Sequence, residues 1–121
     1  MLFRSHNDSF PGSHGLAVGP LGYNGSKAAM ELVAKADVVL ALGTRLNPFS
    51  TLPGYGIDYW PKNAKIIQVD INADRIGLTK PVTVGICGDA KLVAKAILAE
   101  LSSTAGDAGR EERKEIGRAH V

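Results

Sequence analysis

Three short clusters of glycine, arginine and acidic residues follow apolar runs in this 121-residue chain: Gly43-Thr44-Arg45, Asp70-Ile71-Asn72 and Gly88-Asp89. Their residue types suit nucleotide binding. Arg45 could hold a phosphate through two parallel hydrogen bonds, Asp70 could accept from ribose hydroxyls, and the amides after Gly88 could meet a phosphate or an adenine. Glycine turns and aspartate caps also finish strands for structural reasons alone, so an empty crevice is the alternative.

A second glycine-rich region precedes these clusters, with Gly15, Gly19, Gly22 and Gly25 inside a segment dense in turn-forming residues. Their spacing does not match GxGxxG, and the chain has no GxxxxGK[ST] motif. We therefore interpret residues 6–25 as a long shaped loop rather than a phosphate cradle.

Other reactive side chains form no convincing site. His6, Asp8 and His14 lie close in sequence but offer too few ligands for a metal ion. Cys87 follows apolar residues with no histidine or lysine beside it in sequence, so we expect a buried structural thiol. The chain is predicted to contain no catalytic residue and no metal ligand.

The clusters need strands and helices to bring them together. Helical spacing predicts a helix over residues 26–36, and Asp89 is a suitable N-cap for a helix over residues 90–101. Apolar runs predict strands at 38–43, 65–71 and 82–86, the first covered on both faces. The proline-rich stretch 46–63 is expected to be a loop, packed onto the body by Phe49, Tyr55, Tyr59 and Trp60.

Alternating helices and strands predict an α/β fold with an open parallel, Rossmann-like sheet and right-handed crossovers. The carboxyl ends of parallel strands share one edge, so Gly43, Arg45, Asp70, Gly88 and Asp89 should line one crevice. Three strands are few for such a sheet, and we expect a domain truncated at its N-terminal side.

Composition excludes several classes of protein. The 14 basic and 12 acidic residues are scattered, which argues against nucleic-acid binding. No apolar run approaches the roughly 18–20 residues that cross a bilayer, so no membrane partner is expected. One cysteine and no apolar leader at the start predict a cytoplasmic protein.

Both ends of the chain resemble translated sequencing adapters. We therefore expect residues 1–5 and 116–121 to be non-native, residues 6–101 to form the domain, and the polar stretch 102–115 to be a linker.

Four strings carry a family resemblance: HGLAVGPLGYNG at 14–25, ADVVLALGTRL at 36–46, IIQVDIN at 66–72 and GDA at 88–90. They resemble the central domain of thiamine-diphosphate-dependent enzymes of the acetolactate synthase and pyruvate oxidase group. Within that group, HNDSFPGSH at 6–14 and LGTRLNPFSTLPGYGIDYWP at 42–61 are most similar to sulfoacetaldehyde acetyltransferases.

The resemblance implies a longer enzyme that uses thiamine diphosphate and Mg²⁺ to convert sulfoacetaldehyde and phosphate into acetyl phosphate and sulfite, in taurine degradation. Its catalytic N- and C-terminal domains are absent from these residues, so the chain alone should be inactive, and the full-length enzyme should be a homo-oligomer. The loop at Gly22 and Gly25 is implied to approach the cofactor cleft. FAD is not expected, because Tyr23-Asn24 and Asn47-Pro48-Phe49 depart from the family's FAD-binding pattern.

Three alternatives stay open. The chain could be a standalone module that binds ADP, FAD or NAD through Arg45, Asp70 and Asp89. It could be part of an acetolactate synthase-like enzyme, or a structural domain that only associates with catalytic chains.

Overall fold

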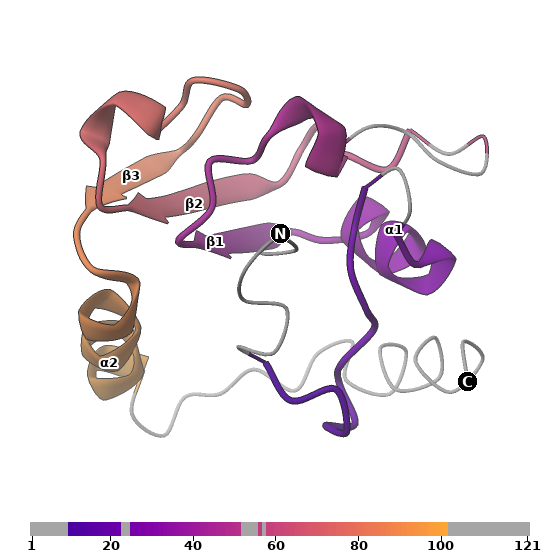
Figure 1. Cartoon of the computed structure of the whole chain (residues 1–121), viewed down its shortest axis with the longest axis horizontal. Coiled ribbons are helices and arrows are strands. Elements are labelled where there is room, and N and C mark those ends of the chain that lie inside the picture. Colours follow the sequence, from indigo (N-terminus) through magenta and orange to yellow (C-terminus); the bar gives the residue numbers. More distant parts are fainter. Residues whose placement is uncertain (1–9, 23–24, 52–55, 57, 102–121) are drawn as a thin grey trace.

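Three parallel strands form one open sheet in the computed structural model, which describes residues 10–22, 25–51, 56 and 58–101 (Figure 1). The strands are β1 (Val38–Leu42), β2 (Lys65–Asp70) and β3 (Val84–Cys87), in the order β1-β2-β3. The register pairs Leu40 with Ile67 and Val69 with Ile86. The predicted α/β fold with a parallel sheet is confirmed.

Two α-helices flank the sheet, and a polar side chain caps each. In α1 (Lys27–Ala34), the Ser26 hydroxyl accepts from the Ala29 N–H at 3.3 Å. In α2 (Ala90–Leu101), the Asp89 carboxylate accepts from the Leu92 N–H at 3.0 Å. Both predicted helices are therefore confirmed at their N-termini, where side-chain oxygens satisfy amides that lack helical partners.

Several predicted boundaries shift by one or two residues: β1 and β2 each end one residue early, and β3 ends one residue late. Helix α1 ends at Ala34, two residues early, because the N–H groups of Lys35 and Ala36 bond to carbonyls three residues back in a tightened last turn. Strand β3 begins at Val84 rather than residue 82. Just before this strand, the Thr83 N–H donates to the Ile66 carbonyl at 2.8 Å, and the Thr83 hydroxyl accepts from the Ile66 N–H at 3.2 Å in place of a backbone carbonyl.

The core lies on one face of the sheet, between the strands and the connecting loops. It centres on Ala41, Ile66 and Leu46, with Trp60 packed against them. The connections carry two 3₁₀ turns, η1 (Pro48–Thr51) and η2 (Ala73–Arg75), on this side of the sheet (Figure 1). Tyr59 and Trp60 pack the loop 46–63 onto the body as predicted; Tyr55 and the Phe49 side chain lie outside the described part.

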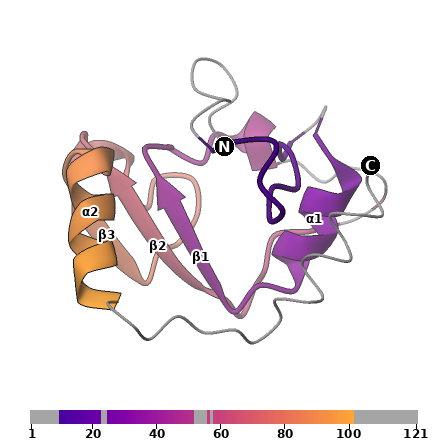
Figure 2. The ribbon, with the colours of Figure 1, turned by 90° about the horizontal axis from the view of Figure 1, so that it is seen from below.

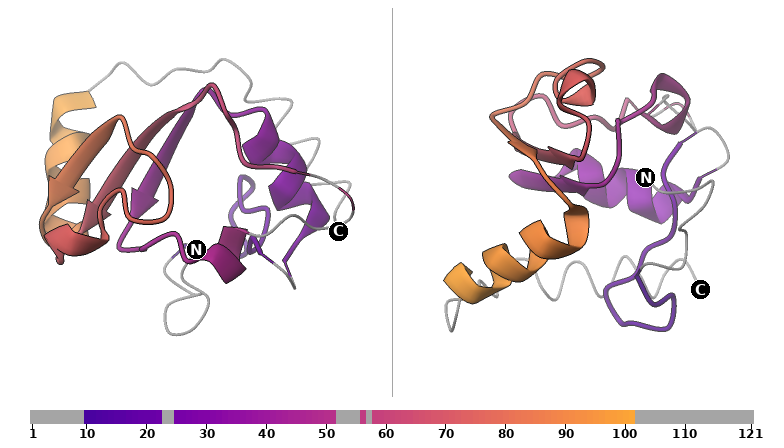
Figure 3. Two further views of the ribbon diagram at one scale, coloured as in Figure 1. Left: turned by 90° about the horizontal axis from the view of Figure 1, so that it is seen from above. Right: turned by 60° about the vertical axis from the view of Figure 1, so that its left-hand side comes forward.

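Helix α2 lies across the opposite face (Figure 3). On that face Val38 and Leu40 of β1 are 55% and 42% exposed, and Val84 of β3 is 46% exposed. The expectation that β1 is covered on both faces is therefore wrong for this chain. Among the segments placed by the structure, α2 makes its principal sheet contacts with β2. Within those segments no helix is long and apolar enough to span a membrane.

Candidate functional site

The ends of the three strands meet at one edge of the sheet (Figure 2). The Gly43 N–H donates to the Val69 carbonyl at 2.8 Å, and the Gly88 N–H donates to the Asp70 carbonyl at 3.0 Å. A Cβ placed on Gly43 would stand 3.5 Å from the Ala90 Cβ, so the turn after β1 lies against the start of α2. The three clusters predicted to share a crevice are therefore neighbours.

The turn after β1 presents Arg45 to solvent. Gly43 has φ +64° and Leu46 has φ +53°, both in the left-handed region, and the Thr44 hydroxyl accepts from the Leu46 N–H at 3.1 Å. Leu46 is thereby buried while Arg45 is exposed. Of the carboxylates that the structure places, none lies within ion-pair distance of Arg45.

The two acidic residues at this edge serve the local fold. Asp70 is 5% exposed, and its Oδ1 accepts from the Asn72 N–H at 2.8 Å, which closes the turn after β2. Asp89 is exposed and caps α2. One oxygen of each carboxylate therefore accepts from a backbone amide, and the other oxygen could bind a ligand.

Sequence reasoning missed Gln68, which holds the loops at this edge together. Its side chain is 1% exposed, its Nε2 donates to the Thr44 carbonyl at 3.0 Å and to the Arg75 carbonyl at 3.3 Å, and its Oε1 accepts from the Gly77 N–H at 2.9 Å. One amide thus joins the turn after β1 to the loop after β2. Its position inside an apolar strand was the available signal, since a buried polar side chain must find partners.

The glycine turn, defined here by its described residues Pro20, Leu21, Gly22, Gly25 and Ser26, precedes α1. The Gly25 N–H donates to the Gly22 carbonyl at 2.8 Å, and the Ser26 N–H donates to the Pro20 carbonyl at 2.6 Å. Helix α1 runs back beside β1, so the turn lies toward the carboxyl ends of the strands (Figure 2).

Tyr59 makes a hydrogen bond with the Gly22 backbone. Burial raises the pKa of the Tyr59 phenol above its usual value, and this hydrogen bond partly offsets the rise. The phenol therefore stays protonated at neutral pH.

The prediction for Cys87 is wrong. Its thiol is exposed, at the end of β3 on the edge of the described sheet, and its Sγ donates to the Ile71 carbonyl at 3.5 Å. Of the residues proposed and rejected as metal ligands, His6 and Asp8 lie outside the described part. Inside it, no group of three or more histidine, cysteine or acidic residues could hold a metal ion.

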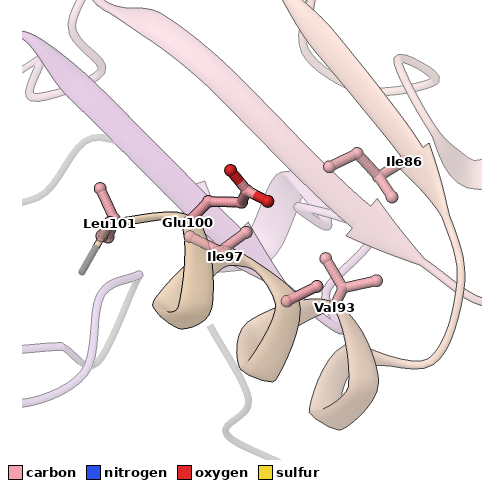
Figure 4. Close-up of a pocket in the computed structure, with 6 residues that line it drawn as sticks. Ile86, Val93, Ile97, Glu100 and Leu101 are labelled. Carbon is pink, nitrogen blue, oxygen red and sulfur yellow. The ribbon is translucent and has the colours of Figure 1, made fainter.

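An apolar groove of about 420 Å³ lies between α2 and β3 (Figure 4). It is lined by β3 and α2 residues: Ile86, Val93, Ala96, Ile97, Glu100 and Leu101. With a single charged side chain among these six, it does not suit a phosphate-bearing ligand.

Comparisons with known proteins show which family the chain is similar to. Residues 4–97 match the family model described as thiamine pyrophosphate enzyme, central domain. The chain is 83% identical over 111 residues to a probable sulfoacetaldehyde acetyltransferase of Rhizobium meliloti (strain 1021), covering 92% of this chain and 19% of that protein. It is 83% identical over 109 residues to a sulfoacetaldehyde acetyltransferase of Roseovarius nubinhibens, covering 90% and 18%.

A more distant relative is a probable acetolactate synthase large subunit of Methanocaldococcus jannaschii. It is 41% identical over 92 residues, covering 76% of this chain and 15% of that protein. The chain spans less than a fifth of the length of the curated relatives it matches.

Proposed function

Because this chain belongs to the thiamine pyrophosphate enzyme family and matches its central domain, we propose that it is the central-domain part of a sulfoacetaldehyde acetyltransferase. The observation that carries the proposal is 83% identity to proteins of that name over nine-tenths of the chain. The whole protein would convert sulfoacetaldehyde and phosphate into acetyl phosphate and sulfite, with thiamine diphosphate and Mg²⁺, in cytoplasmic taurine degradation.

The metal ion of that cofactor finds no cluster of ligands among the described residues. These offer no three-ligand cluster for Mg²⁺, and the acidic groups at the sheet edge each have an oxygen bonded to a backbone amide. We therefore place the metal site in the N- and C-terminal domains of the longer protein. The chain alone is not catalytic in this proposal.

The central domain would brace the two catalytic domains. The exposed apolar residues Val38, Leu40 and Val84 support this role, because a parallel sheet is normally covered on both faces. In this proposal residues 102–115 lead toward the C-terminal domain, and residues 1–5 and 116–121 are non-native. The longer protein would be a homo-oligomer.

The test begins with long-read sequencing of the source DNA, which recovers the flanking reading frame. The longer protein and residues 6–115 alone are then assayed for acetyl phosphate and sulfite from sulfoacetaldehyde and phosphate. We expect equal amounts of both products from the longer protein and none from the short one. Acetolactate formation from pyruvate by the longer protein, without acetyl phosphate, would assign it to the acetolactate synthases instead.

One observation favours a second function, nucleotide binding. Arg45 is exposed at the edge where Gly43, Asp70 and Gly88 meet, and the described part places no carboxylate beside it. Titration calorimetry of the longer protein with ADP, FAD and NAD tests this. Saturable binding that Arg45→Gln weakens at least about tenfold, the scale of one charge-assisted contact, would support an occupied crevice. Absence of binding would leave the crevice structural.

A further inference from the structure

We draw no further inference here: the strongest candidate, the apolar groove between α2 and β3 lined by Ile86, Val93, Ala96, Ile97, Glu100 and Leu101, is an unpartnered face of the described residues, and nothing in the structure identifies the segment or partner that covers it.

Discussion

The two faces of the sheet differ in how completely this chain covers them. On the loop face, Ala41 and Ile66 are buried, and Gln68 has partners for both its nitrogen and its oxygen. On the helix face, Val38 and Leu40 are about half exposed and an apolar groove separates α2 from β3. Residues of the described segments bury the apolar side chains of the loop face but leave those of the helix face partly exposed.

Under the proposed function, this difference bears on where the rest of the longer protein would pack. The loop face positions the carboxyl edge through contacts among β1, β2, β3 and the turns that follow them, such as the bond from Gln68 to the Thr44 carbonyl. The helix face exposes apolar surface whose burial would stabilise the fold by about 25 cal/mol per Å². We infer that the helix face is where the remaining polypeptide of the proposed enzyme packs.

The largest expected effect is on the free energy of unfolding when one apolar side chain on each face of the sheet is truncated. Ile66→Ala should lower the free energy of unfolding by about 2–5 kcal/mol, because it leaves a cavity in the core. Leu40→Ala should cost less than about 1 kcal/mol in the 121-residue chain, because Leu40 is already 42% exposed.

Urea titration followed by the fluorescence of Trp60, the single tryptophan, measures both values. In the longer protein, where the helix face is proposed to be covered, the two costs should converge. Equal costs in the 121-residue chain would contradict the contrast between the faces.

The next effect concerns Gln68 on the loop face. Gln68→Leu removes three hydrogen bonds and leaves backbone groups of Thr44, Arg75 and Gly77 without their amide partner. We expect a loss of about 3 kcal/mol, the cost of unsatisfied buried groups. Lys65→Met, at the exposed start of the same strand, should change stability by less than about 0.5 kcal/mol. An equally small change in stability for Gln68→Leu, measured by urea titration, would show that the hydrogen bonds of the Gln68 amide are dispensable.

Alanine substitutions at two glycines compare the stability of the tight turn before α1 with that of the more open loop preceding it. Gly25→Ala forces a Cβ against backbone atoms of Leu21 and Pro20, and should cost about 2 kcal/mol. Gly15→Ala has nothing within 4 Å of its new Cβ and should be neutral or slightly stabilising. Thermal unfolding of the two variants, recorded side by side, tests this; an equal Tm would mean that the turn relaxes around the new methyl group.

The smallest effect is expected at the helix cap. Asp89→Ala removes the carboxylate that accepts from the Leu92 N–H and should cost about 1 kcal/mol, whereas Asp89→Asn should retain most of the cap. Circular dichroism during urea titration measures both. Loss of several kcal/mol in Asp89→Ala would mean that Asp89 also connects the strand ends.

Local patterns in the sequence predicted much of this structure. Apolar spacing identified α1, Asp89 identified the start of α2, and the apolar runs identified the strands, because caps and periodic burial depend on near neighbours. The parallel order then placed Gly43, Asp70 and Gly88 at one edge. The ligand roles of Gly22, Gly25, Gly43, Arg45, Asp70, Gly88 and Asp89 remain predictions.

The sequence by itself determined the element types, the shared edge and the family. Only the tertiary structure decided that Gln68 joins two loops, that Tyr59 reaches Gly22, and that Cys87 is exposed. Each of these depends on groups far apart in the chain or on which face of a strand is covered. Hydrophobic periodicity cannot report such contacts, because they are fixed only when the loops pack against the sheet.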